Sequence, residues 1–278
     1  MSRPLTEKEV HRWVTAAQAQ WARDLTFQEL RKGVQAVSNL YVHKRAKGGL
    51  SRKAADGRGK KAAFAVYYGG LHLLLVQAWT LGRPPPPLVE VADVGCGPGV
   101  VGAAIARWVG ASQLASSDIR GEHLQVATWT ARRLGLRSRT RKQGLPEVVA
   151  RAPRRRTLWT FGWVLNELPE DALQATLSAL CRRLQDGDGA VIFAPLSTRA
   201  SPWWPRAVRL LTAARPDLST EEFRFLASQA ETFGLPVEWL RVEDAARVDL
   251  HGNGVAESAR RAEAAFESRG TPLSVLEE

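Results

Sequence analysis

Four residues at alternate positions, Asp93, Gly95, Gly97 and Gly99, form the pattern with the clearest chemical meaning. They end a short apolar run typical of a buried strand, and a helical pattern follows them directly. Glycine is required in such a turn where a side chain would block a ligand's approach or a positive φ is needed. Turns of this kind bind dinucleotides, nucleoside triphosphates or S-adenosylmethionine. A triphosphate loop is excluded because no Gly-Lys-Ser/Thr follows the turn.

The register of the glycines separates the two remaining cofactors. A dinucleotide loop places its first glycine directly after the strand. Here the spacing Gly-x-Gly-x-x-Gly is met only by Gly97, Gly99 and Gly102, which start two residues late and enclose Pro98. A second acid, Asp118, ends another predicted strand, where a carboxylate can accept both ribose hydroxyls of an adenosine. Asp118 could instead cap a helix.

Read from Asp93, the turn resembles motif I of the class I S-adenosylmethionine-dependent methyltransferases. The resemblance implies that the glycine loop passes the methionine part of the cofactor and that the acid orients its amino group. It implies S-adenosylmethionine as the cofactor. The residues expected to bind it are Asp93, Gly95, Cys96, Gly97, Gly99, Asp118, Ile119 and Asn166.

The stretch FGWVLNELPED, residues 161–171, is the third candidate for chemistry. We expect a strand to end at Asn166 and a helix to begin at Pro169. In class I methyltransferases this strand end faces the transferred methyl group. Asn166 matches the first position of the Asn/Asp-Pro-Pro-Tyr/Phe motif of enzymes that methylate amines of nucleic acids, but the remaining positions differ. We therefore predict Asn166 and Glu167 as catalytic residues, although Glu167 could simply favour the helix dipole, and Trp163 as a stacking face or a core residue.

The order of helical and strand patterns predicts an α/β fold. Strands alternate with helices from residue 84 onward, which is typical of a doubly wound, Rossmann-like methyltransferase sheet. We expect this methyltransferase domain over residues 84–250, an α-helical, basic N-terminal domain over residues 1–83 and a helical tail over residues 251–278. Within the first of these segments, residues 6–47 are predicted to be helical and residues 48–61 to form a mobile basic loop.

The net charge of +11 is distributed unevenly along the chain. Residues 1–83 carry fifteen Lys or Arg and five acids, whereas residues 217–278 carry six Arg and thirteen acids. Residues 131–156 add ten Lys or Arg against Glu147. This asymmetry favours a nucleic acid as partner, although a generally charged surface would give the same count. The predicted substrate contacts are Arg31, Lys32, Lys44, Arg45, Lys60, Lys61, Trp163 and Trp203.

A closer resemblance covers residues 25–200. LTFQELRKGVQAVSNLYVHKR, followed later by WVLNELPED, is similar to the ribosomal small-subunit methyltransferase-like family of bacteria and mitochondria. The resemblance implies association with small-subunit ribosomal RNA. The chain also departs from that family. Many members carry a cysteine cluster for an iron–sulfur centre or a metal, whereas this chain has only Cys96 and Cys181. We therefore predict no metal, and the difference leaves room for another substrate.

These patterns together predict an S-adenosylmethionine-dependent methyltransferase that acts on RNA, and ribosomal RNA is the RNA that we expect as its substrate. The alternatives are a small metabolite or peptide as acceptor, with the N-terminal helices as a lid, a non-catalytic ribosome assembly factor, and an NAD-dependent enzyme. A tight pocket capped by residues 1–80 would favour the metabolite or peptide. We expect a cytoplasmic protein without a membrane span, because no run of about eighteen apolar residues occurs. The oligomeric state stays open.

Overall fold

The protein folds around one seven-stranded sheet in the order β3-β2-β1-β4-β5-β7-β6. The computed structural model describes residues 3–43, 57–87, 90–152, 156–195, 200–223 and 245–249. The strands are β1 Glu90–Val94, β2 Gln113–Asp118, β3 Arg137–Lys142, β4 Thr157–Gly162, β5 Gly189–Pro195, β6 Ser219–Phe223 and β7 Ala245–Asp249. The first five run parallel, and β7 is antiparallel to both of its neighbours. The predicted doubly wound methyltransferase sheet is confirmed.

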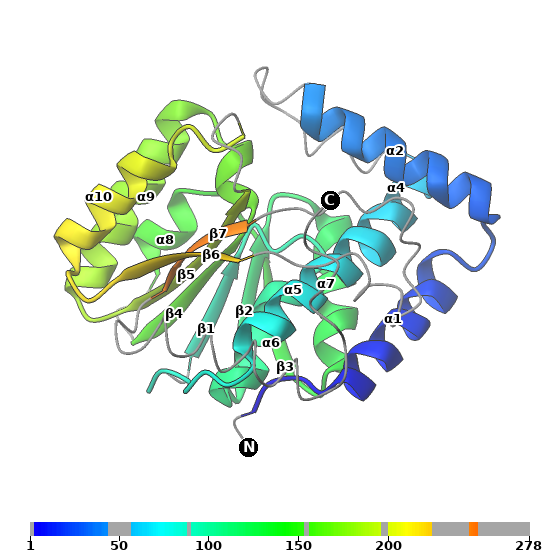
Figure 1. Ribbon diagram of the computed structural model, residues 1–278, viewed down its shortest axis with the longest axis horizontal. Helices are drawn as coiled ribbons and strands as arrows, with labels where there is room; N and C mark the ends of the chain where they lie inside the picture. Colours follow the sequence, from blue (N-terminus) through cyan, green and yellow to red (C-terminus); the bar gives the residue numbers. More distant parts are fainter. Residues whose placement is uncertain are drawn as a thin grey trace, which may run out of the picture.

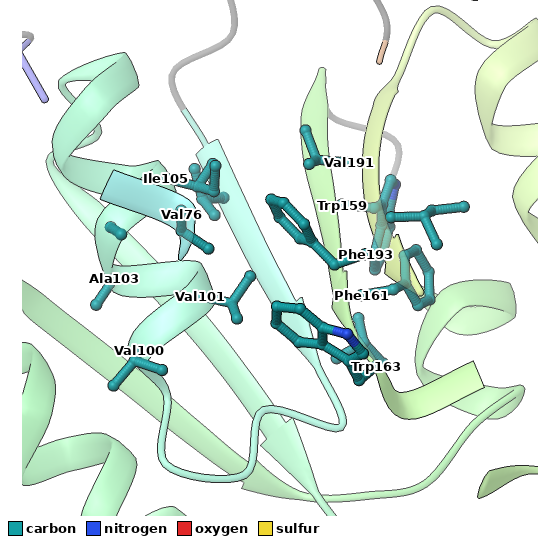
Figure 2. Close-up of a cluster of buried hydrophobic side chains, with 14 of the residues drawn as sticks. Val76, Val100, Val101, Ala103, Ile105, Trp159, Phe161, Trp163, Val191 and Phe193 are labelled. Carbon is teal, nitrogen blue, oxygen red and sulfur yellow. The ribbon is translucent and has the colours of Figure 1, made fainter. Parts of the chain in front are cut away.

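Helices cover both faces of this sheet (Figure 1). On one side lie α5 Gly69–Thr80, α6 Val100–Val109 and α7 Gly121–Arg133, and on the other α8 Glu147–Arg151, α9 Glu170–Gln185 and α10 Trp204–Ala214. Apolar residues of both helix layers and of the central strands are almost fully buried. Figure 2 shows part of this core, where Val76, Val101 and Ile105 lie near the side chains of β4 and β5. Burial on both faces explains the nearly continuous apolar runs of these strands.

The N-terminal segment forms three further helices. These are α1 Glu7–Trp21, α2 Phe27–His43 and α4 Arg58–Ala62, and α4 continues through a π-helical turn, η2 Ala63–Tyr68, into α5. The helical pattern predicted over residues 6–47 forms two helices, with a turn between Trp21 and Phe27, and residues 44–47 lie outside the described residues. Thr26 starts the second helix through a capping box with Glu29, whose side chain accepts a hydrogen bond from Thr26 N at 2.7 Å. Of the predicted basic loop, residues 48–56 lie outside the described residues, and the rest contributes to α4.

One helix of the described residues, Arg58–Thr80, is long and apolar enough to cross a membrane. It has 23 residues, but 83% of its apolar window is buried inside the protein. A core helix gives the same signal, and Leu73, Leu74 and Val76 are indeed buried in the core described above. Its hydrophobicity is thus accounted for by packing against α6 and the sheet.

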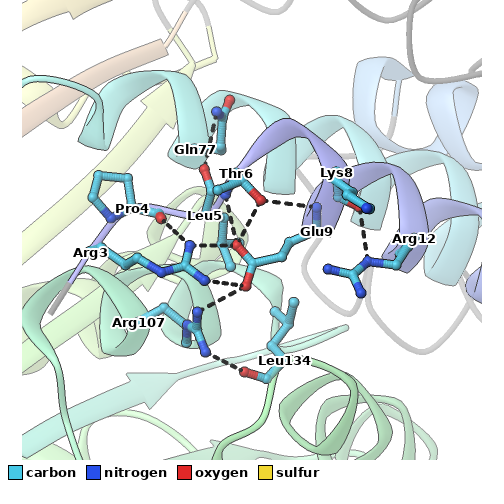
Figure 3. A network of polar contacts seen from close by, with 10 residues as sticks. All are labelled: Arg3, Pro4, Leu5, Thr6, Lys8, Glu9, Arg12, Gln77, Arg107 and Leu134. Atoms are coloured by element: carbon cyan, nitrogen blue, oxygen red, sulfur yellow. Dashed lines mark hydrogen bonds and ion pairs between the residues drawn. The ribbon is translucent and has the colours of Figure 1, made fainter. Parts of the chain in front are cut away.

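A half-buried carboxylate, Glu9, attaches α1 to helix α6 (Figure 3). Glu9 accepts hydrogen bonds from Arg3 Nη1 at 2.7 Å and from Thr6 N at 2.9 Å, and Arg107 Nη2 of α6 lies 2.9 Å from its other oxygen. Partial burial raises the pKa of Glu9, but the hydrogen bonds from Arg3 and Thr6 and the charge of Arg107 outweigh burial and lower the pKa to about 2. The ionised carboxylate is therefore the form that holds the helix.

Replacing this carboxylate should loosen the N-terminal helices. We expect Glu9→Gln to lower the free energy of unfolding by about 1–2 kcal/mol at neutral pH, because a helix cap and a charged hydrogen bond are both weakened. The folded-state pKa lies below the ordinary value of 4.5, so the wild-type advantage should vanish progressively as the pH falls from 4.5 to about 2. Urea unfolding across this pH range measures it. If Glu9→Gln costs as much in an Arg107→Gln background as in wild type, the two residues are not coupled and the interpretation is wrong.

Candidate functional site

A pocket opens at the carboxyl ends of β1, β2 and β4. In a doubly wound sheet this is where the strand order reverses and where ligands bind. The residues predicted for the cofactor that line it are Asp93, Gly95, Cys96, Gly97, Asp118, Ile119 and Asn166. Gly99 does not line it and instead precedes α6 as its N-cap. The pocket thus gathers residues from three strand ends that are far apart in the sequence.

The turn after β1 requires its glycines. Gly95, Gly97 and Gly99 have φ values of +63°, +50° and +73°, which side-chain-bearing residues rarely adopt. A Cβ on Gly95 would overlap the side chain of Val164, and a Cβ on Gly99 would come within 2.7 Å of Ala127 Cα. Side chains are therefore disfavoured at these three glycine positions, and the bare backbone of Gly95 and Gly97 borders the pocket.

Asp93, at the end of β1, is 1% exposed and lacks one hydrogen-bond partner. Thr160 Oγ1 donates to its Oδ1 at 2.8 Å, while Oδ2 has no partner of good geometry among the described residues. Burial raises the pKa of Asp93 to about 7. Gly102 lies against this carboxyl group, because a Cβ there would overlap it. The third glycine of the Gly-x-Gly-x-x-Gly spacing thus serves packing around Asp93. The Gly102 backbone also lowers the pKa of this carboxyl group, and a buried carboxylate with so few donors fits a cationic group of a ligand.

Asp118, at the end of β2, is held ionised by its neighbours. Its Oδ2 accepts a hydrogen bond from Gly97 N at 3.0 Å and lies 3.2 Å from His123 Nδ1, and its Oδ1 accepts from Arg120 N at 2.9 Å. Burial raises the pKa of Asp118, but the contacts with His123 and the two backbone donors outweigh it and lower the pKa. Arg120, not Asp118, is the N-cap of α7. Oδ1 keeps a free lone pair, so the carboxylate can accept a hydrogen bond from a ribose hydroxyl.

Next to this carboxylate the pocket becomes apolar. Ile119 is 54% exposed and is the exposed large hydrophobic side chain of the described residues. It borders the pocket together with Gln143, Gly144 and Leu145, which follow β3. An exposed apolar side chain beside a carboxylate suits the flat face of a ring such as adenine. The residues after β3 were not predicted, and the only available signal was their place after a strand of a doubly wound fold.

The N-terminal helices supply an aromatic wall that the sequence interpretation missed. Phe64, Tyr68 and His72 line the pocket from η2 and α5. Their spacing of four residues places them on one helix face, and this spacing was the signal that could have found them. Phe64 also stacks on His123, with ring centroids 4.6 Å apart. The π-helical turn lies in this wall, and such turns often occur at functional sites.

The strand predicted to reach Asn166 ends earlier, at Gly162. Trp163 adopts a left-handed conformation with φ +59°, and Val164–Glu167 form a 3-10 turn. The Asn166 side chain stabilises this turn, because its Nδ2 donates to Trp163 O at 3.2 Å and its Oδ1 accepts from Ser201 Oγ at 3.1 Å. Asn166 and Glu167 both line the pocket. Asn166 therefore has a structural role, and one lone pair of its Oδ1 is left for a substrate.

Trp163 does not offer a free face to a base. His72 stacks on it with centroids 3.8 Å apart and planes 12° apart, and Phe193 packs parallel to it at 5.4 Å. The side chain is 8% exposed, so the prediction of a stacking face is wrong and the core alternative holds, although Trp163 also borders the pocket.

Trp203 does not close over the pocket. It is 6% exposed, packs edge-on against Trp204 with ring centroids 5.5 Å apart, and is not among the pocket residues. Its predicted contact with a substrate is therefore wrong. Trp203 and Trp204 instead lie at the start of α10. The buried Trp203 side chain packs this end of the helix into the core.

The predicted phosphate-binding residues lie outside the pocket. Arg31 and Lys32 are exposed on α2, Lys61 is exposed on α4, and Lys60 is half-buried. Two others, Lys44 and Arg45, lie outside the described residues. Lys60 and Lys61 precede Phe64 by one helical turn, so positive charge stands beside the aromatic wall. Among the described residues, no cluster of three or more His, Cys, Asp or Glu side chains could hold a metal ion.

Comparison with known proteins identifies the central part of the chain. Residues 91–187 match the model of a methyltransferase domain family. No curated protein matches the sequence. An O-methyltransferase family protein from Burkholderia thailandensis is 14% identical, with 82% of this chain and 70% of that chain covered and a TM-score of 0.55. At this identity the likeness shows the fold.

Two other solved structures are less similar. A SAM-dependent methyltransferase from Leishmania major is 10% identical, with 84% and 90% of the two chains covered and a TM-score of 0.48. The 16S rRNA methylase RmtB is 13% identical, with 88% and 90% covered and a TM-score of 0.41. The matched domain spans the glycine turn, Asp118 and the Asn166 turn described above. The protein is an enzyme with a methyltransferase domain, and its cofactor is S-adenosylmethionine.

Proposed function

We propose that this methyltransferase modifies RNA, with small-subunit ribosomal RNA as the first acceptor to test. The observation that carries the proposal is the continuous helix Arg58–Thr80. Its first turn carries Arg58, Lys60 and Lys61, and the next turns carry the aromatic wall of the pocket. The basic residues lie outside the pocket and the aromatic side chains line it. This arrangement fits a nucleic acid whose phosphates are bound outside the pocket while one base enters it.

The charge of the pocket also favours binding of the phosphates outside it and of a base inside it. Its lining contains the carboxyl groups of Asp93, Asp118 and Glu167, and no Lys or Arg among the described residues. Such a pocket suits the positive sulfonium and ammonium groups of the cofactor and a neutral acceptor, but it disfavours a phosphate. A polyanionic substrate must therefore be held by the basic residues outside.

Methyl transfer needs few catalytic side chains, because the bound cofactor supplies an already activated methyl group. Asp118 is placed to hold the ribose and Asp93 the amino group, which fixes the direction of the transferred methyl. The aromatic wall excludes water from the reacting atoms. Where the acceptor is an amine, the Glu167 carboxylate can take the proton that the nitrogen loses, and Asn166 Oδ1 can orient the amine.

A small metabolite or a peptide is the second candidate acceptor. The specific observation in its favour is that Phe64, Tyr68 and His72 reach the pocket from the N-terminal helices. Helices in that position could act as a lid over a small molecule, as expected for this alternative.

Labelled S-adenosylmethionine distinguishes these acceptors. The protein is incubated with a cell extract, and the RNA, protein and small-molecule fractions are separated and counted. We expect label in RNA, and within it in the small-subunit ribosomal fraction, with Asp118→Ala as the inactive reference. Label confined to the small-molecule or protein fraction would refute the proposed acceptor and favour the second candidate.

A further inference from the structure

The edge strand β3 exposes a row of arginines on a part of the sheet that none of the described helices covers. Alternate residues of a strand point to the same face, so Arg137, Arg139 and Arg141 share one face of Arg137–Lys142. Arg139 pairs with Ala115 of β2. Ala115 is itself exposed although β2 lies between two strands. The face formed by Arg137, Arg139 and Arg141, the β3 arginine face, is therefore open to solvent at the edge of the sheet (Figure 1).

Within the described part of the chain, these arginines have no acidic partner. All three are exposed, and no described acid forms an ion pair or hydrogen bond with any of them. Other arginines do have acidic partners, such as Arg206 with Glu170 and Arg215 with Asp217. A charged edge strand also discourages aggregation, but three like charges on one face repel one another, and a bound anion would relieve this repulsion.

The row leads to the pocket. Lys142, at the end of β3, pairs with Asp118 at the end of β2. The next residues, Gln143 and Gly144, already line the pocket. A linear polyanion lying along β3 would therefore arrive at the adenine end of the cofactor site.

We propose that the β3 arginine face binds the phosphate backbone of the RNA substrate where the RNA approaches the β3 edge of the pocket. This inference rests on the proposed function. Residues of a strand rise about 3.3 Å each, so alternate arginines stand about 6.6 Å apart, which is close to the separation of successive phosphates along one RNA strand. A guanidinium group binds phosphate through two parallel hydrogen bonds. The occupant of the face is thus a phosphodiester backbone.

A matched pair of double variants tests this surface. Arg139→Gln with Arg141→Gln removes two charges from the β3 arginine face. Arg182→Gln with Arg209→Gln removes two exposed charges from α9 and α10, which lie on the same face of the sheet but pack beside β5, four strands away from β3. Binding of the full-length proteins to small-subunit ribosomal RNA is measured over a range of salt concentrations. We expect the β3 variant to bind about tenfold or more weakly and to reduce the salt slope by about 0.7–0.9 for each arginine lost. The α9–α10 variant should bind as wild type does.

Methyl transfer supplies an independent readout. We expect the β3 variant to raise the KM for RNA while kcat and the affinity for S-adenosylmethionine stay unchanged, because the arginines touch neither cofactor nor acceptor base. Equal losses in both double variants, or no loss in either, would overturn the inference. So would binding of the β3 face to phosphatidylserine vesicles in preference to RNA.

The outcome separates this inference from the proposed function. If wild type labels RNA and the β3 variant labels and binds it equally well, the face is not the docking surface while the proposed function stands. If wild type labels no RNA, the proposed function fails, and the inference, which depends on it, is rejected as well.

Discussion

Asp118→Ala should weaken the binding of S-adenosylmethionine about 100-fold without unfolding the protein. Two contributions are lost together. In the proposed site the carboxylate accepts a hydrogen bond from the ribose, and in the structure it holds the glycine loop through Gly97 N at 3.0 Å. Hydrogen bonds to a charged group contribute about 1.5–3 kcal/mol each, so a loss of about 3 kcal/mol, or two powers of ten in affinity, is the expected scale.

Calorimetric titration with the cofactor measures this effect. Asp118→Asn keeps one acceptor oxygen but loses the charge, and we expect an affinity between those of wild type and Asp118→Ala. Glu122→Gln is the matched control, because it removes an exposed carboxylate four residues away, in the first turn of α7. Unchanged affinity in Asp118→Ala, with an unchanged thermal midpoint, would reject the assignment of this residue to the ribose.

The fold was predictable because its signals are local. The strands of the parallel part of the sheet are short runs bounded by turn residues, and they alternate with helical patterns from residue 84 onward. The glycine turn was equally predictable, since the positive φ values of Gly95, Gly97 and Gly99 require that residue type wherever the chain folds this way. Asp93 and Asp118 follow from their positions at strand ends.

The rest of the site depends on contacts between distant segments. The spacing of Phe64, Tyr68 and His72 indicates one helix face, but nothing local tells which element that face meets. Trp163 could be a core residue or a stacking face by its sequence alone. The contacts of Trp163 with His72 of α5 and Phe193 of β5 show that it is a core residue.

The early end of β4 had no local signal either. A tryptophan with positive φ is rare and costs conformational energy, so the sequence predicted that the strand continues to Asn166. Stacking between His72 and Phe193 fixes the indole, and the Asn166 amide satisfies its carbonyl. Tertiary packing thus overrides the backbone preference at the point where the acceptor must enter.

Cofactor affinity should increase as the pH rises through about 7, and this dependence should disappear in Asp93→Asn. Burial raises the pKa of the Asp93 carboxyl to about 7, so much of the free enzyme carries a proton there below that pH. The positive amino group of the cofactor favours the ionised carboxylate, and binding therefore releases the proton. Linkage then predicts an affinity gain approaching tenfold for each pH unit below about 7 and a plateau above it.

The same linkage gives the opposite sign for the stability of the free protein. The ordinary pKa of 3.8 applies to the unfolded chain, so between 3.8 and about 7 the folded state binds more protons than the unfolded state. Ionising Asp93 therefore destabilises the free fold as the pH rises, and a bound cation offsets this cost. Titrations of wild type and Asp93→Asn at about pH 6 and about pH 8 isolate Asp93 from the other titrating groups of the pocket. An equal pH dependence in both proteins would show that another group binds the cofactor's charge, whereas loss of the dependence in Asp93→Asn would assign that role to the buried carboxyl group at the end of β1.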